Sequence, residues 1–191
     1  MKNVFSKFIN FFRNKAKKFP DKRKGRSNAT YKIEDIVLSA FSIFHVQSPS
    51  FLQYQKNMEK KEGRSNAESL FGVKKVPSDN HIRDILDNVE VEHLRPMYDK
   101  QLEYLENAEI LDSYIYMGKF YPTALDGTQY HSSKKIHCKK CLTKKHNETV
   151  RYSHQVITPT LVSPFMSEII PLMPEFIRNE DGSEKQDCEI N

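Results

Sequence analysis

The sequence has no tryptophan, few glycines and few cysteines, and these absences exclude several classes of protein. Six glycines in 191 residues are too few for a glycine-rich all-β repeat protein. Three cysteines with a single Cys-x2-Cys pair do not form a disulfide framework, and they favour a reducing compartment. No apolar run is long enough to span a bilayer, and the N-terminus lacks the apolar segment of a secretory signal. We therefore expect a cytoplasmic protein without a membrane partner.

Positive charge is concentrated in two blocks. Residues 1–26 carry ten Lys or Arg and one acid, and residues 134–151 carry seven and one, whereas the remainder of the chain has a net charge of −10. Such blocks attract nucleic-acid phosphates, because binding releases condensed counterions. Anionic lipid is the alternative partner, and a solvated tail and loop is the alternative without any partner. Two separate blocks favour nucleic acid.

Residues 1–30 are interpreted as a basic N-terminal arm and linker. Apolar side chains recur at helical spacing near its start and predict an amphipathic helix that packs against the rest of the protein: Val4, Phe5, Phe8, Ile9 and Phe12. Four side chains of the linker are candidates for binding phosphate: Lys22, Arg23, Lys24 and Arg26. The alternative is a disordered basic tail.

Residues 31–111 carry the apolar periodicity of about five short helices, and this helical region is the candidate DNA reader. The apolar face of the first helix is predicted from Ile33, Ile36, Val37, Ala40 and Phe44. The helix starts are predicted from capping residues, which are Thr30, Ser48 before Pro49, a Ser65–Glu68 capping box, and Ser78. The break at Ser48–Pro49 fits a helix-turn-helix, although two capped helices occur in any helical domain.

Residues 112–191 change to β-type patterns. Three extended segments, SYIYMGKFYPTALDG, TVRYSHQVITPTLVSP and FMSEIIPLMPEFI, follow one another without a helix between them. This succession predicts an antiparallel meander. The last residues, NEDGSEKQDCEIN, suggest a turn and the start of a helix too short to form alone. We therefore expect an α+β chain that stops in the middle of an element.

One carboxylate in this part has a specific chemistry. Asp126 follows an apolar run and precedes Gly127, which predicts a carboxylate at the end of a strand, beside a turn. Mg²⁺ is commonly held by one or two protein carboxylates and substrate phosphates, and Gly127 would let a phosphate approach the backbone. The alternative is an ordinary strand-to-turn sequence.

Five segments in order carry a resemblance to a known family. They are PSDNHIRDILD (77–87), ALDGTQYHSSKKIHCKKCL (124–142), a Tyr-x-His strand (152–154), PLMPEFI (171–177) and KQDCEIN (185–191). Together they resemble the N-terminal portion of a bacterial insertion-sequence transposase of the DDE type. The resemblance implies a helical DNA-binding region ahead of the first three strands of a ribonuclease H-like catalytic core.

The resemblance also carries expectations about the site. Asp126 matches the first catalytic carboxylate, which implies Mg²⁺ or Mn²⁺ as the cofactor of the complete enzyme and the ends of a DNA element as its partner. The family's later Asp and Glu have no match here. We therefore expect a truncated or split product, associated with the nucleoid, which is inactive without a C-terminal half or a second copy. A DNA-binding module or inhibitor of transposition is the alternative.

The segment after Asp126 allows two interpretations. Cys138 and Cys141 supply half of a zinc site, and the other ligands would come from His131, His137, His146 or His154. That second half is irregular, since His146 and His154 are eight residues apart and His154 lies in a predicted strand. The preferred interpretation is a phosphate grip, which needs no missing ligand, made by Lys134, Lys135, Lys139, Lys140, Lys144 and Lys145. Cys188 is expected to be a small buried apolar group, and a zinc-dependent nucleic-acid adaptor is the third function considered.

Overall fold

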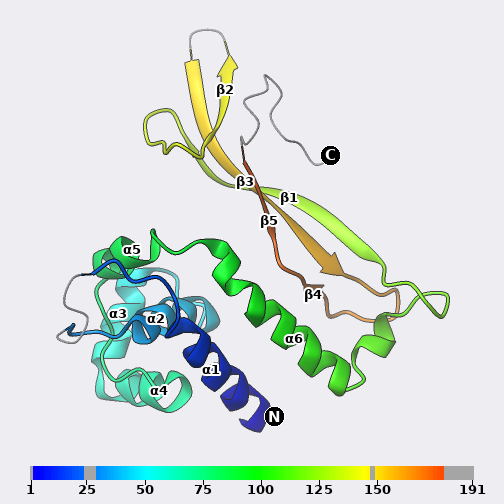
Figure 1. Ribbon diagram of the computed structural model, residues 1–191, viewed down its shortest axis with the longest axis horizontal. Helices are drawn as coiled ribbons and strands as arrows, with labels where there is room; N and C mark the ends of the chain where they lie inside the picture. Colours follow the sequence, from blue (N-terminus) through cyan, green and yellow to red (C-terminus); the bar gives the residue numbers. More distant parts are fainter. Residues whose placement is uncertain (1, 24–28, 147–148, 179–191) are drawn as a thin grey trace. The chain divides into compact units, whose positions relative to one another are not determined.

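The computed structural model describes residues 2–23, 29–146 and 149–178, and in these residues the chain has an α+β fold with six α-helices and an antiparallel sheet (Figure 1). The chain forms two compact units, residues 1–101 and residues 102–191. Each unit is described by itself below. No helix in the described ranges is both long enough and apolar enough to cross a membrane.

The first unit is helical, as the periodicity of residues 31–111 predicted. Its elements are α1 (Lys2–Ala16), α2 (Ile33–His45), α3 (Phe51–Glu59), α4 (Lys61–Phe71), α5 (Asp79–Leu86), the 3₁₀ turn η2 (Val91–Leu94) and the start of α6 (Arg95–Asn107). The unit also includes the residues that the sequence assigned to the N-terminal arm, because α1 contributes Ile9, Phe12 and Ala16 to its core. The predicted packing of α1 is therefore confirmed for Phe5, Phe8, Ile9 and Phe12, whereas Val4 is exposed.

An ion pair ties α1 to two other helices. The Arg13 guanidinium lies 2.7 Å from the Asp35 carboxylate of α2 and donates to the Phe71 carbonyl at 2.8 Å. Phe71 is the last residue of α4, whose final carbonyls have no partner within the helix. Arg13 therefore both satisfies a helix C-terminus and joins three helices.

Several predicted helix details are wrong. Ser50, not Ser48, is the N-cap of α3, and its side chain accepts a hydrogen bond from the Gln53 amide at 3.1 Å. Residue 65 lies inside α4, so the Ser65–Glu68 capping box does not form, and α2 begins after Lys32 rather than at Thr30. Phe44 is 80% exposed, although it was placed on the apolar face of α2. Capping motifs recur so often in this polar chain that only the final hydrogen bonding selects among them. Ser78 does stand at the N-cap position of α5, as predicted, but its side chain makes no capping hydrogen bond.

The second unit is built around one long central strand. Its strands are β1 (Thr123–Ser133), β2 (Leu142–His146), β3 (Thr149–Leu161), β4 (Ile170–Pro171) and β5 (Glu175–Ile177), and each of the other four pairs antiparallel with β3. β1 covers one edge of β3, whereas β2, β5 and β4 follow one another along the other edge (Figure 1). The predicted antiparallel succession is thus present. β2 was not predicted, because its lysines were interpreted as a loop.

The first predicted strand was misplaced. Residues 111–114 form the 3₁₀ turn η3, and β1 starts only at Thr123 and continues to Ser133. Asp126 and Gly127 therefore lie within β1, not at its end, because β3 is long enough to pair with both, through Thr158 and Ile157. The ladder shifts register between Gln129 and His131, where Tyr130 forms a bulge.

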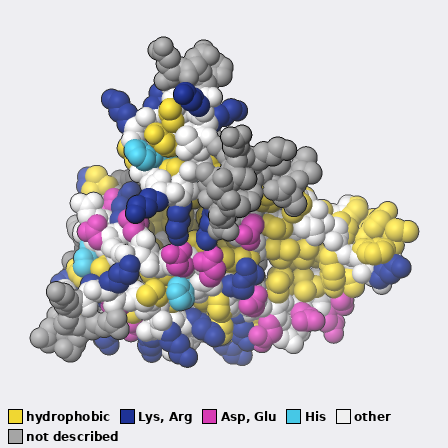
Figure 2. Space-filling view, turned by 45° about the horizontal axis from the view of Figure 1, so that its top comes forward, with side chains coloured by type: hydrophobic (Ala, Val, Ile, Leu, Met, Phe, Trp, Pro, Cys, Tyr) yellow, Lys and Arg dark blue, Asp and Glu magenta, His cyan; other side chains and the backbone are white. Residues whose placement is uncertain are grey.

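The core of the second unit is small. Tyr114, Leu161 and Ile170 are buried together, and the Tyr114 hydroxyl donates to the Glu168 carbonyl at 2.9 Å. Residues 123–130 of β1, by contrast, are all exposed. Exposed apolar side chains also gather on the segment before β1, which lies on the right of Figure 2: Ile115, Tyr116, Met117, Phe120 and Tyr121. Within the described residues, β1 is therefore an exposed strand, whereas most of β3 is half-buried.

Candidate functional site

Asp126 projects from β1 opposite Thr158 and is exposed. Side chains that pair directly across two strands share a face, so Asp126, Thr158 and, two residues along, Val156 lie on the same face of the sheet. The nearest acid of β5, Glu175, pairs with Ile157 and so lies on the opposite face. These described residues place one carboxylate, not a pair, on this face.

The magnesium expected from the family resemblance does not fit the described residues. Two-metal phosphoryl transfer needs several carboxylates around two ions about 3.5–4 Å apart. Within residues 2–23, 29–146 and 149–178, the only group of three or more metal-ligating side chains that converges does not include Asp126. No catalytic step is therefore derived through Asp126 alone.

The six lysines predicted to bind phosphate lie on and beside the hairpin of β2 and β3. Lys134 and Lys135 directly follow β1, Lys139 and Lys140 form a turn, and Lys144 and Lys145 lie in β2. All six lysines are exposed, and Lys and Arg side chains border this hairpin at the top of Figure 2.

One cross-strand pair of this hairpin consists of two positive charges and destabilises the fold. Lys144 lies directly across from Arg151, which is also exposed. Like charges in directly opposed positions of an antiparallel ladder destabilise the sheet. The two charges therefore do not stabilise the hairpin. An anion that contacts both side chains would reduce their repulsion.

The linker residues are only partly described. Lys22 donates to the Asn88 side chain at 2.9 Å and is exposed. The Arg23 guanidinium is bound to the Asp21 carboxylate at 2.7 Å and to the Tyr31 carbonyl at 2.8 Å, so it also has a structural role in the helical unit. Lys24 and Arg26 lie outside the described residues.

A second group of side chains converges in the same hairpin. The Nε2 atom of His154, in β3, lies 3.3 Å from the Sγ atoms of both Cys138 and Cys141, and the two sulfurs are 3.8 Å apart. Cys141 is buried and Cys138 is exposed. Sequence reasoning had named all three residues but disfavoured His154 because it lies in a strand. Its position in β3 brings His154 into the group, because Cys138 and Cys141 lie beside the face of β3 from which His154 projects.

The local electrostatics favour neutral imidazole at this position. Burial lowers the pKa of His154, and the neighbouring His131 lowers it further. Burial raises the pKa of the Cys141 thiol, and hydrogen bonding from the Cys138 backbone opposes that rise. Both shifts favour the uncharged forms of His154 and Cys141.

Of the other predicted zinc ligands, His137 contacts a different side chain, whereas His131 lies beside His154. The His137 ring stacks on Tyr152 with centroids 4.3 Å apart, and its Nδ1 atom lies 3.1 Å from the Lys135 carbonyl oxygen. His131 pairs with His154 across the strands, with ring centroids 5.7 Å apart. The side chain of His146 and the whole of Cys188 lie outside what the structure describes.

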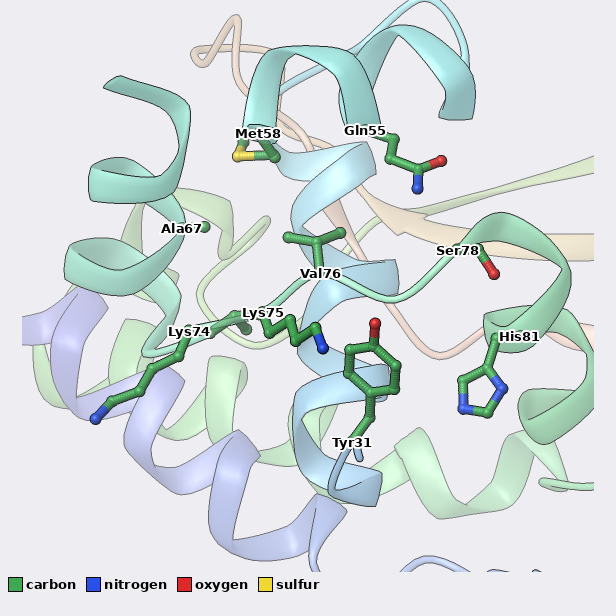
Figure 3. A pocket seen from close by; sticks show the side chains of 10 residues that line it. Tyr31, Gln55, Met58, Ala67, Lys74, Lys75, Val76, Ser78 and His81 are labelled. Atoms are coloured by element: carbon green, nitrogen blue, oxygen red, sulfur yellow. The ribbon is translucent and has the colours of Figure 1, made fainter. Parts of the chain in front are cut away.

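The helical unit contains an open pocket of about 630 Å³. Figure 3 shows Tyr31, Lys75 and His81 beside one another in it: the Lys75 ammonium lies 5.3 Å from the Tyr31 ring centroid, and the His81 ring centroid lies 5.5 Å from that of Tyr31. None of the site residues predicted from the sequence lines this pocket.

Comparison of the chain with protein-family models, with curated proteins and with solved structures finds no match. The function is therefore inferred from the residues and their geometry.

Proposed function

We propose that this chain is a DNA-binding portion of a transposase of the DDE type, in which the basic hairpin contacts the phosphate backbone. The observation that carries the proposal is the set of six exposed lysines on and beside one hairpin, including Lys144 directly across from Arg151. Two opposed like charges lower the stability of the sheet, so we expect their role to be binding a polyanion such as DNA.

Two further features support the transposase assignment. The antiparallel order, with β1 on one edge of β3 and β5 and β4 on the other, is the order expected for the first half of a ribonuclease H-like core. Asp126 lies on β1, the strand on which that family carries its first catalytic carboxylate. The ordered sequence segments described above are the remaining support.

Since one carboxylate cannot hold two metal ions, the proposed role of the chain by itself is binding, not strand cleavage. Asp126 would supply one ligand to Mg²⁺ or Mn²⁺ only when further carboxylates, from another polypeptide or a longer product, complete the set.

Binding of the full chain to a fluorescent DNA duplex of arbitrary sequence, measured by anisotropy over a series of salt concentrations, tests the proposal. Each lost phosphate contact lowers the slope of log affinity against log salt by about 0.9. The double variant Lys134→Gln/Lys135→Gln is therefore expected to lower the slope by about 1.8. The control variant Lys119→Gln removes a charge from the segment before β1, outside both the hairpin and the helical region, and is expected to keep the slope. Equal slopes for both variants, or an affinity that ignores salt, would refute the proposal.

A further inference from the structure

Cys138, Cys141 and His154 lie where three ligands of a tetrahedral metal ion would lie. We propose that they bind one structural Zn²⁺ ion, with His131 as the fourth ligand. This inference does not depend on the proposed function, because it rests only on the geometry of the hairpin.

The distances between the ligand atoms support the site. With Zn–S near 2.3 Å and Zn–N near 2.05 Å, a tetrahedral ion sets its sulfurs about 3.8 Å apart and each sulfur about 3.6 Å from a ligand nitrogen. The two sulfurs here are 3.8 Å apart, and each is 3.3 Å from the His154 Nε2 atom. One ion can therefore contact all three atoms with little movement of the side chains.

One backbone amide of the Cys-x2-Cys turn already points toward a sulfur: the Cys138 amide donates to the Cys141 Sγ atom at 3.2 Å. The Cys141 amide donates to the Cys138 carbonyl at 3.3 Å and closes the turn. An amide donor stabilises the thiolate form, which is the form that binds zinc. When the ion binds, each thiol releases its proton to solvent and its sulfur forms a bond to zinc.

A disulfide between the two cysteines would be a different use of the same residues. A disulfide needs sulfurs about 2.05 Å apart, whereas these are 3.8 Å apart. A disulfide also has no need of an imidazole, yet the His154 nitrogen is equally distant from both sulfurs. This symmetry is what a shared ion requires.

His131 is the candidate for the fourth ligand. It is the direct cross-strand partner of His154, so both rings project from the same face, and the ring centroids are 5.7 Å apart. Two imidazoles on one tetrahedral zinc have centroids about 5 Å apart, which follows from the Zn–N distance. The Nε2 atom of His131 now lies 3.4 Å from the Ile136 carbonyl oxygen, a weak contact that rotation of the ring would break.

The donor set also selects the kind of ion. Thiolates and imidazoles suit Zn²⁺, whereas Mg²⁺ and Ca²⁺ require oxygen ligands. Two thiolates balance the charge of Zn²⁺, so the complete site is neutral. The ion would join the turn that carries Lys139 and Lys140 to β3 and β1, and would hold the two exposed lysines in one conformation.

Metal binding by the full chain tests the site directly. The protein is purified under reducing conditions without chelator, its zinc content is measured, and the metal-free form is then titrated with Co²⁺. The expected result is one zinc per chain and a Co²⁺ complex with the intense thiolate-to-cobalt absorption and the visible bands of a tetrahedral ion. Less than one tenth of an equivalent of zinc, together with no such absorption on adding Co²⁺, would overturn the proposal.

Variants separate ligands from neighbours. Cys138→Ser and His154→Asn are each expected to weaken zinc binding at least 100-fold. His137→Asn removes a histidine from the same loop whose ring stacks on Tyr152 instead, and is expected to bind as the unchanged protein does. Equal losses in all three variants, or none in the first two, would contradict the assignment.

Unfolding of a variant does not obscure the test, because zinc protection can be measured on the unchanged chain. Alkylation of Cys138 and Cys141, followed peptide by peptide by mass spectrometry, is expected to slow at least tenfold when zinc is present. Unchanged rates would overturn the site. His131→Asn is expected to weaken zinc binding about tenfold while keeping the thiolate-to-cobalt absorption, and an unchanged affinity would remove His131 from the set.

Discussion

The opposed pair Lys144 and Arg151 leads to a prediction in which stability and DNA binding change in opposite directions. Lys144→Gln removes one of two like charges that face each other across β2 and β3. Cross-strand charge pairs change stability by roughly 0.2–1 kcal/mol, so relief of the repulsion is expected to contribute about 0.5 kcal/mol. In a unit of residues 102–191, this corresponds to an increase in Tm of about 2–4 °C.

The same substitution is expected to weaken DNA binding. Loss of one phosphate contact lowers the salt slope by about 0.9, so over a fourfold rise in salt the variant's affinity falls about 3.5-fold less than that of the unchanged chain. Thermal unfolding at low salt, where screening is weakest, measures the first effect, and anisotropy with a DNA duplex measures the second.

Lys145→Gln is the matched control for this prediction. Lys145 is the next residue of β2 and is also exposed, but it pairs with Val150 and so faces no opposed charge. The control variant is expected to show no such rise in Tm, and since neighbouring residues of a strand project from opposite faces, it leaves the Lys144–Arg151 pair intact. If Lys144→Gln is no more stable than Lys145→Gln at low salt, the repulsion inferred from the strand register is absent.

Three further predictions follow from other parts of the molecule. Removal of zinc by a chelator is expected to lower DNA affinity about threefold or more, because the turn of Lys139 and Lys140 is no longer held in place. The Cys138→Ser variant should show the same lower affinity and no further response to chelator. If neither change alters DNA affinity, the metal site does not contribute to DNA binding. Arg13→Leu is expected to lower the free energy of unfolding of the helical unit by about 2 kcal/mol, measured in urea. The substitution breaks a charge-assisted hydrogen bond to Asp35 and leaves the last carbonyl of α4 without its donor. A change under about 0.5 kcal/mol would mean that water replaces both contacts. Asp126→Asn is expected to alter stability by less than about 0.5 kcal/mol and to leave DNA binding at least as strong, because the side chain is exposed; a large loss of stability would show that Asp126 has a structural role instead.

Short-range patterns in the sequence were sufficient for most of the secondary structure. Apolar spacing placed the helices of residues 31–111, and alternation in TVRYSHQVITP placed β3, because these periods reflect which side of an element faces the core. Helix starts were less predictable. Thr30, Ser48 and Ser65 all have capping chemistry, yet none of them is an N-cap. The residues before α2 and α4 are Lys32 and Lys60, because tertiary packing, not a cap, sets where these helices begin.

The arrangement of the candidate sites was not contained in these local patterns. The sequence by itself determined that Asp126, six lysines and a Cys-x2-Cys pair lie within a short segment, and that this segment is basic. Strand register then decided their partners: it placed Lys144 opposite Arg151, Asp126 inside β1 rather than at its end, and His154 against both cysteines. Register depends on pairing between residues distant in the chain, which the hydrophobic pattern of one strand cannot specify. For that reason the proposed zinc ligands, disfavoured from their spacing, came together only in the tertiary structure.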